Sequence, residues 1–514
     1  LLPTTYSLLP DSELIMTDVL FGQSYYLRFD PKLWEGMQPY PPLGSLYAAS
    51  YIRGQGYDVA LFDAMLAESE AEWAAALELH RPKYAVLYED SFNYLSKMCL
   101  LRMRQAAFTM AEAAKARGCT VIISGSDATD HAEKYFQHGV DFILMGEGEL
   151  TLGELLDQLS GRVERPFESI LGLVWLQEGQ IQRTAERPFV KDLDNFPFPA
   201  WDLVDIPRYQ KIWYKHHGYY SMNMVTTRGC PYRCNWCAKP IYGRRYNSRS
   251  PENVVAELKW LKDNFKPDHI WFADDIFGLK PGWIEKFSQL AVEQDAIVPF
   301  KCLQRVDLIK EEIAAALRQA GCKTVWVGAE SGSQKILDAM DKDTKVADIY
   351  TATERLHRAG IEMCFFLQFG YPGEGWDDIQ QTLKMVRECR PDNIGISVSY
   401  PLPGTKFYEN VKIQLGEKTN WLHSDDLDML YRGPFVADFY RVLHHRVHHE
   451  YRARKAWRNI LKALKNPAAL RPGHIRQAIS IPINLARLVK SSTQLRRLAK
   501  VSHDDPVKLE LQSV

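Results

Sequence analysis

Short apolar runs alternate with amphipathic helical stretches along the first 160 residues of the chain. The apolar runs have the length and composition of buried strands, and we expect strands at 18–24, 58–63, 84–89, 120–124 and 142–145. The periods between them predict helices at 43–55, 69–80, 97–117 and 131–138. Such alternation is typical of an α/β fold with a doubly wound parallel sheet. Residues 16–160 are therefore expected to form one Rossmann-like domain.

The same alternation of strands and helices resumes in the middle of the chain. We expect strands at 222–226, 269–274, 300–305, 324–328, 362–369 and 393–399. The helices that fit between and after them span 251–265, 281–292, 310–320, 346–359 and 376–389. Six such units predict a partial, TIM-like (β/α)6 barrel over 221–408, whose chemistry belongs at the carboxyl ends of its strands.

Two connecting or flanking regions follow other patterns. Residues 161–220 combine a predicted hairpin at 171–184 with a Pro- and aromatic-rich run at 196–202, which indicates a hairpin followed by a stiff linker. Residues 409–514 are predicted to be mainly helical.

Charge is distributed unevenly although the net charge is only −1. Residues 441–514 contain 16 Lys and Arg against 4 Asp and Glu, a formal charge of +12, so the rest of the chain carries −13. Within this tail an apolar stretch, 479–489, precedes a basic one, 490–500. We expect peripheral contact with an anionic membrane surface or docking onto the acidic body, and we expect no nucleic-acid partner.

The composition is that of a globular protein, with 46% apolar residues and no apolar run of about eighteen residues that would suggest a membrane span. No secretory leader pattern opens the chain. Residues 1–15 look like an upstream extension, and Met16 is a plausible true start. We expect a cytoplasmic protein, with membrane association at the inner face through the basic tail.

Three of the nine cysteines lie within eight residues, as Cys230, Cys234 and Cys237. Three thiolates in a C-x3-C-x2-C pattern can ligate a [4Fe–4S] cluster and leave one iron open to a small molecule that has an amine and a carboxylate. The alternatives are a zinc knuckle and a disulfide knot. Zinc sites usually take four ligands from two paired arms, and the chain has no second C-x2-C arm. The other six cysteines are scattered and are expected to be small buried apolar residues.

Residues 222–408 resemble the radical S-adenosylmethionine superfamily closely, because the three cysteines match its cluster motif and polar residues follow the predicted strands. The resemblance implies that Asp274 and Asp275 contact the amino group of S-adenosylmethionine and that Arg305 forks onto its carboxylate. The set implied to bind S-adenosylmethionine is Trp236, Asp274, Asp275, Arg305, Glu330, Ser331, Gly370 and Pro372. Each of these residues also has an ordinary alternative, as a helix cap or as part of a core ion pair.

The N-terminal domain resembles the cobalamin-binding domain of B12-dependent radical S-adenosylmethionine enzymes. The likeness is greatest to the branch with the anaerobic magnesium-protoporphyrin ester cyclase and hopanoid-modifying proteins. It rests on Pro-Pro-Leu-Gly at 41–44, Gly-x-Asp-Val at 56–59, Gly125-Ser126 and Gly-Glu-Gly-Glu at 146–149. The residues implied to bind cobalamin are Tyr88, Asp90, Asn93, Gly125, Ser126, Gly146, Glu147 and Gly148.

The loop at 23–40 corresponds to the one that supplies a cobalt-ligating histidine in related mutases, and it contains no histidine. We therefore expect cobalamin without a protein imidazole on cobalt. The alternatives are a cobalamin-free relic of this domain and plain strand–helix turns at these glycines.

The leading hypothesis is a cobalamin-dependent radical C-methyltransferase that acts on an unactivated carbon of a small-molecule or lipid-like substrate through a 5′-deoxyadenosyl radical and methylcobalamin. An oxidative cyclase of the magnesium-protoporphyrin IX monomethyl ester type is the alternative. A methylthiotransferase acting on tRNA would bring a second cluster with three more cysteines, and a non-catalytic cofactor-binding protein would not need the cluster cysteines. An electron donor such as flavodoxin or ferredoxin is an expected partner, and no catalytic residue is assigned.

Overall fold

The computed structural model describes residues 17–237, 242–465 and 472–501. The expected extension at 1–15 and the expected start at Met16 lie outside the described residues. The chain divides into two compact units. The first comprises residues 1–231, 238–274 and 422–425, and the second comprises residues 232–237, 275–421 and 426–514.

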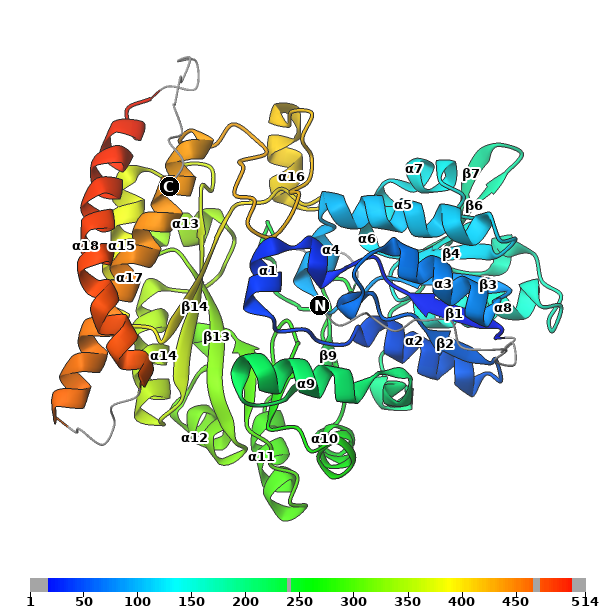
Figure 1. The fold of residues 1–514 in the computed structure, drawn as a ribbon, viewed down its shortest axis with the longest axis horizontal. Helices are drawn as coiled ribbons and strands as arrows, with labels where there is room; N and C mark the ends of the chain where they lie inside the picture. The colour runs from blue at the N-terminus through cyan, green and yellow to red at the C-terminus, as the bar shows by residue number, and fades with distance from the viewer. Residues whose placement is uncertain (1–16, 238–241, 466–471, 502–514) are drawn as a thin grey trace. The chain divides into compact units, whose positions relative to one another are not determined.

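A seven-stranded sheet organises the first unit, in the order β2-β1-β3-β4-β5-β6-β7 (Figure 1). The first five strands pair in parallel, in the 2-1-3-4-5 order of the doubly wound fold. Their bounds are β1 Val19–Gly22, β2 Val59–Leu61, β3 Tyr84–Tyr88, β4 Thr120–Ser124 and β5 Phe142–Leu144. The sheet predicted for 16–160 is confirmed.

The predicted hairpin at 171–184 extends this sheet instead of lying in a separate linker. Its strands, β6 (Leu173–Gln177) and β7 (Gln180–Arg183), pair antiparallel, and β6 also pairs antiparallel with β5. Leu173, Val174 and Trp175 are buried, so the start of this hairpin contributes to the core of the sheet.

Helices cover both faces of the seven-stranded sheet (Figure 1). Residues of α3, α5 and α7 build the apolar core on one face, and residues of α2 and α8 build the core on the other. The predicted helix at 97–117 is divided into α4 and α5, because Cys99 adopts a left-handed backbone with φ of 48°. The helices of this sheet are α1 Pro31–Gly36, α2 Leu43–Gly54, α3 Glu70–His80, α4 Tyr94–Met98, α5 Leu101–Lys115, α6 Ser126–Asp130, α7 Ala132–Gln137 and α8 Gly148–Leu159.

The middle of the chain forms a six-stranded sheet in the order β15-β14-β13-β12-β11-β8. The recorded pairs are all parallel, as the predicted partial (β/α)6 barrel requires. The strands are β8 Ser221–Met224, β11 His269–Phe272, β12 Phe300–Gln304, β13 Cys322–Glu330, β14 Glu362–Phe369 and β15 Asn393–Val398. A small antiparallel pair, β9 (Thr227–Arg228) with β10 (Asn247–Ser248), follows the first of these strands.

Helices alternate with the strands of this sheet, as the periodicity predicts. The amphipathic helices at 346–359 and 376–389 in the prediction appear as α14 (Val346–Arg358) and α15 (Trp376–Cys389). The other helices from the linker to the end of the barrel are α9 Ile206–His217, α10 Pro251–Phe265, α11 Trp283–Glu293, α12 Glu311–Gln319, α13 Gln334–Ala339 and α16 Lys406–Val411.

Two long helices, α17 (Ala437–Lys465) and α18 (Pro472–Leu498), complete the second unit and pack along each other (Figure 1). The tail predicted to be mainly helical, 409–514, is helical over 437–465 and 472–498, whereas residues 415–436 form no helix. Among the described residues, no helix is both long enough and apolar enough to cross a membrane.

Candidate functional site

The three clustered cysteines follow the short strand β9 on one continuous loop. Cys230 is buried, whereas Cys234 and Cys237 are partly exposed, and none of the three forms a disulfide. Among the described residues, no three His, Cys, Asp or Glu side chains already converge as a metal cage. The donor set itself fits a cluster held by three thiolates, since the thiols are unoxidised and adjacent along one loop.

Residues 226–237 are called the cysteine loop. Its first half, residues 226–230, is held by a buried carboxylate. Asp274 accepts hydrogen bonds from the backbone N–H and the hydroxyl of Thr226, at 2.7 and 2.8 Å, and from those of Thr227, at 2.8 and 3.0 Å. Burial raises the pKa of Asp274 to about 6, although these hydrogen bonds oppose the shift. A carboxylate has about four acceptor positions, so the four hydrogen bonds from Thr226 and Thr227 occupy those of Asp274.

Arg228 forms a second buried contact of this first half. Its guanidinium donates to Glu149 at 2.7 Å and lies 3.4 Å from Glu147, and all three side chains are at most 4% exposed. Phe196 packs 4.7 Å from the same guanidinium. Burial raises the pKa of Glu147, and Arg228 opposes that rise. The Gly-Glu-Gly-Glu segment therefore contacts the cysteine loop, a role that the sequence analysis did not assign to Arg228 or Glu149.

The residue before the first cysteine must be glycine. Gly229 has φ of 80°, and a Cβ at this position would lie 2.2 Å from the carbonyl oxygen of Arg245. Only a residue without a side chain fits such a backbone so close to the carbonyl of another segment.

The second half of the cysteine loop, residues 232–237, is held by the amide of Asn235. Its backbone N–H donates to Met340 O at 3.0 Å, and its side-chain nitrogen donates to Ala339 O at 2.8 Å. Its side-chain oxygen accepts from the Tyr371 hydroxyl at 2.8 Å, and its carbonyl accepts from Phe407 N–H at 3.0 Å. Cys234 and Cys237, which flank Asn235 in the sequence, therefore lie on a segment that these hydrogen bonds hold in place.

Arg305 lies beside this second half. Its guanidinium stacks 3.5 Å from the ring centroid of Tyr232 and donates to the carbonyl of Lys342 at 3.2 Å. Its other partners are Asp307, at 3.0 Å, and the carbonyl of Asp343. Arg305 therefore lies next to the cysteine loop, and its role toward a carboxylate of S-adenosylmethionine stays a prediction.

Glu330 pairs with Lys342, which the sequence analysis missed. The Lys342 ammonium donates to Glu330 at 2.9 Å and lies 5.9 Å from the ring of Trp236. Burial lowers the pKa of Lys342, but Glu330 and then Cys234 outweigh it and hold the pKa above its ordinary value. Lys342 lies on a loop far from the cysteines in sequence, so no spacing pattern could have indicated it.

The backbone around Glu330 is specialised for this ion pair. Glu330 has φ of 55°, and the β13–β14 register shifts between Gly328 and Glu330. A Cβ on Gly328 would lie 2.3 Å from the Glu330 carboxylate and 2.5 Å from the Lys342 ammonium. Gly328 thus leaves the space that the pair occupies, and the left-handed backbone is a local strain of the kind found at functional sites.

The remaining residues predicted to bind S-adenosylmethionine lie on neighbouring turns of the second unit. Ser331 contacts the Thr382 hydroxyl at 3.1 Å, and the exposed Pro372 is in a turn. Gly370, with φ of 83°, donates its N–H to Glu374 at 2.6 Å. Burial raises the pKa of Glu374 to about 8, and its second oxygen is buried with no hydrogen-bond partner in the part of the chain that the structure describes. Asp275 is half-buried.

The residues predicted to bind cobalamin gather at the carboxyl ends of β3, β4 and β5, where a doubly wound sheet binds its ligand. Tyr88 accepts a hydrogen bond from Gly148 N–H at 3.2 Å, and Asp90 accepts from Gly44 N–H at 3.1 Å. Asn93 caps α4, and Ser126 is the first residue of α6.

Several of these predicted cobalamin residues already make contacts inside the protein. Gly125 packs on Glu89, Gly146 has φ of 66°, and Glu147 is paired with Arg228. The side-chain oxygens of Gln23 and Tyr25, in the loop directly after β1, are buried without a hydrogen-bond partner among the described residues. An orphaned acceptor at this place fits a polar ligand.

Comparisons with known proteins agree with this geometry. Residues 224–386 match the Radical SAM superfamily model. The chain is 27% identical to an uncharacterised methyltransferase of Pyrococcus horikoshii, over 72% of this chain and 78% of the relative. It is 24% identical to the anaerobic magnesium-protoporphyrin IX monomethyl ester cyclase of Synechocystis, over 74% of this chain and 75% of the relative.

Solved structures show the same fold. The radical S-adenosylmethionine methyltransferase TsrM from Kitasatospora setae, with cobalamin and a [4Fe–4S] cluster, matches with a TM-score of 0.63 at 17% identity, over 78% of both chains. The cobalamin-dependent enzyme OxsB matches with a TM-score of 0.60 at 20% identity, over 73% of this chain and 52% of that one. Residues 224–386 therefore match the radical S-adenosylmethionine superfamily, and the chain has the fold of the cobalamin-dependent enzymes TsrM and OxsB.

Proposed function

We propose that this protein is a cobalamin-dependent radical S-adenosylmethionine C-methyltransferase that acts on an unactivated carbon of a small-molecule or lipid-like substrate. The observation that carries the proposal is the cysteine loop, whose second half is held beside Arg305, Trp236 and the Glu330–Lys342 pair. The methyltransferase names of several relatives and the cobalamin of the structural neighbours support it.

In this proposal Cys230, Cys234 and Cys237 hold the [4Fe–4S] cluster. When bound, the cluster supplies one electron at low potential for cleavage of S-adenosylmethionine, and a corrinoid supplies the methyl group. The protein's own residues orient the cofactor. Arg305 provides a guanidinium for a carboxylate, and Trp236 provides a flat apolar surface for the adenine.

The buried Glu330–Lys342 pair keeps both charges in place without a ligand. The Lys342 ammonium contacts the ring of Trp236 and interacts electrostatically with Cys234, so it is a positive group beside this cysteine. Such a group stabilises thiolate ligands and the negative charge that a reduced cluster would carry. Lys342 therefore has a positioning and electrostatic role in this proposal.

Anaerobic reconstitution with iron, sulfide, cobalamin and a flavodoxin or ferredoxin reductant tests the reaction. Incubation with S-adenosylmethionine is expected to yield 5′-deoxyadenosine, and with a methyl-accepting substrate also S-adenosylhomocysteine. A corrinoid spectrum that survives gel filtration would show that cobalamin is retained. Production of neither nucleoside by a cluster-loaded protein would overturn the proposal.

An oxidative cyclase is the second candidate, and the similarity to magnesium-protoporphyrin ester cyclases favours it. The two functions differ in their products, because cyclisation consumes S-adenosylmethionine without forming S-adenosylhomocysteine. Substrate-dependent formation of S-adenosylhomocysteine separates them.

We also propose peripheral contact with an anionic membrane through α18. The helix exposes Ile479 at 69%, Ile483 at 53% and Val489 at 68% of their surfaces, and basic residues follow toward its end. An apolar stripe beside basic residues suits the interface of an anionic bilayer. Flotation with phosphatidylglycerol vesicles, and none with pure phosphatidylcholine vesicles, is the expected result.

A further inference from the structure

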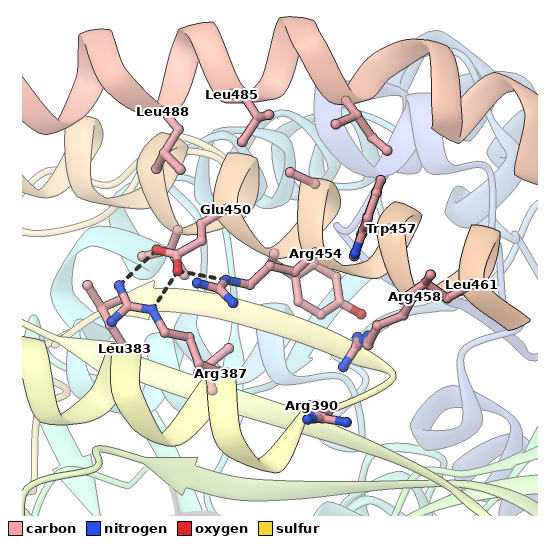
Figure 2. Close-up of a pocket in the computed structure, with 15 residues that line it drawn as sticks. Leu383, Arg387, Arg390, Glu450, Arg454, Trp457, Arg458, Leu461, Leu485 and Leu488 are labelled. Atoms are coloured by element: carbon pink, nitrogen blue, oxygen red, sulfur yellow. Dashed lines mark hydrogen bonds and ion pairs between the residues drawn. The ribbon is translucent and has the colours of Figure 1, made fainter.

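A cavity of about 560 Å³ lies between α15, α17 and α18, within the second unit (Figure 2). Its size is that of a small-molecule site. None of the residues assigned to the cluster or to S-adenosylmethionine lines it. The cavity is therefore separate from the proposed catalytic residues.

One wall of the cavity is apolar and open to solvent. On α17, Trp457 and Leu461 are 58% and 43% exposed, and on α18 Leu485 is 48% exposed, with Ile481 and Leu488 beside it. The spacing of four residues on α17, and of four and three on α18, turns both apolar stripes toward the same cavity. Large apolar side chains gathered in an open pocket indicate a binding surface.

The opposite wall is strongly basic. Four arginines and one glutamate, Glu450, line the cavity. The Glu450 carboxylate already forms ion pairs with three arginines: with Arg387 at 2.5 Å, Arg454 at 3.0 Å and Arg446 at 3.6 Å. Figure 2 shows these contacts to Arg387 and Arg454 as dashed lines. One carboxylate therefore serves several guanidinium groups.

The other two arginines of the cavity, Arg390 and Arg458, form no ion pair with any described residue. Figure 2 shows Arg458 extending from α17 toward Arg390 at the end of α15, with Trp457 on the α18 side of α17. Burial lowers the pKa of Arg458; nearby Tyr451 and Asp392 oppose this, and the charges of Arg390 and Arg454 lower the pKa further. Asp392, which is engaged by His357 at 3.0 Å, lines a neighbouring pocket together with Arg390 and Arg458, and so do Glu354, Glu362 and Glu388.

We propose that this cavity binds one anionic lipid molecule, with its phosphate between Arg390 and Arg458 and its acyl chain along the apolar stripes of α17 and α18. A guanidinium pair forks onto phosphate oxygens, and the unbalanced positive charge selects an anion. The adjoining apolar wall selects a hydrocarbon chain over free phosphate. The proposal does not depend on the proposed reaction.

The test uses the full chain and dihexanoyl phosphatidylglycerol as a monomer, below its micelle concentration, in isothermal titration calorimetry. One saturable site is expected. The zwitterionic dihexanoyl phosphatidylcholine and inorganic phosphate are each expected to bind about tenfold more weakly, because one lacks net charge and the other lacks the chain.

The double variant R390Q/R458Q is expected to weaken the monomer affinity about tenfold or more. The matched control R496Q/R497Q removes the same charge from exposed positions at the end of α18, outside the cavity, and is expected to bind like wild type. Thermal unfolding checks that each variant is folded, and R390Q alone, at an exposed position, serves if the double variant is not.

Equal weakening in both double variants would overturn the proposal, because it would show a general charge effect. Binding to phosphatidylglycerol vesicles without any monomer binding would also overturn it, since the membrane surface would then be the partner. So would self-association of the chain that the R390Q/R458Q variant abolishes, because a second copy would then occupy the cavity. None of these measurements uses S-adenosylmethionine or an electron donor, so their failure leaves the proposed reaction untouched.

Discussion

The two halves of the cysteine loop are held by different physical means. Residues 226–230 depend on buried charge: Asp274 accepts four hydrogen bonds, and Arg228 is enclosed with Glu147 and Glu149. Residues 232–237 depend on a neutral amide, Asn235, and on the stacking of Arg305 over Tyr232. The two compact units divide within this loop, after Pro231.

This difference has an energetic consequence. A buried charge that loses its partner costs more than a neutral group that loses a hydrogen bond. The first half is therefore expected to be intolerant of single changes, and its stability is expected to recover when the charges of Arg228, Glu147 and Glu149 are removed together. The second half is expected to lose stability in smaller steps.

The largest expected effect comes from the cysteines, which test whether both halves serve one function. Cys230→Ala, from the first half, and Cys234→Ala, from the second, are both expected to abolish the visible absorption of the reconstituted cluster and the formation of 5′-deoxyadenosine. The control is Cys389→Ala, a buried cysteine outside the loop, which is expected to keep both. Wild-type deoxyadenosine formation by either loop variant would refute the cluster assignment.

The second largest effect concerns the buried charges of the first half. Arg228→Met leaves Glu147 and Glu149 buried and unpaired, and it is expected to lower the free energy of unfolding by about 3–5 kcal/mol. Chemical denaturation measures this loss.

The triple variant R228M/E147Q/E149Q removes all three charges and is expected to recover most of that stability. A triple variant as unstable as R228M would show that the guanidinium acts through packing on Phe196 instead of through charge.

A smaller effect is expected for the neutral contact of the second half. Asn235→Ala removes the side-chain bonds to Ala339 and Tyr371 and is expected to cost about 1–3 kcal/mol. The matched control Asn264→Ala removes a bond from an exposed helical asparagine and is expected to cost less. If N235A proved as costly as R228M, the contrast between the two halves would fail.

The last effect is a pH dependence near the second half. Burial raises the pKa of Glu374 from its ordinary 4.5 to about 8, so the folded protein keeps a proton that the unfolded chain releases. This contribution to stability is fully present below about pH 4.5 and is lost as the pH rises to about 8. Glu374→Gln is expected to flatten the melting temperature across this window.

Thermal unfolding between about pH 6 and about pH 9 measures this slope. The control Glu354→Gln, at an exposed glutamate, is expected to keep the wild-type dependence. An unchanged slope in E374Q would show that Glu374 is already ionised in the folded protein.

The sequence by itself determined the two sheets, most of their strands and the loop that holds the three cysteines. Apolar periodicity carries this information because each strand and helix must bury one face, whatever its neighbours are. The sequence also predicted that Trp236, Arg305 and Glu330 lie in one region, since residues that follow parallel strands meet at one edge of the sheet.

Only the tertiary structure decided the partners of those residues. Lys342 reaches Glu330, and Arg228 reaches Glu147 and Glu149, across separations of 12, 81 and 79 residues. Local patterns contain no information about such pairs, because a buried charge is matched by whichever group the fold brings near. The same holds for the cavity of α15, α17 and α18. Its Arg390 and Arg458, which form no ion pair with a described residue, look in sequence like ordinary surface arginines.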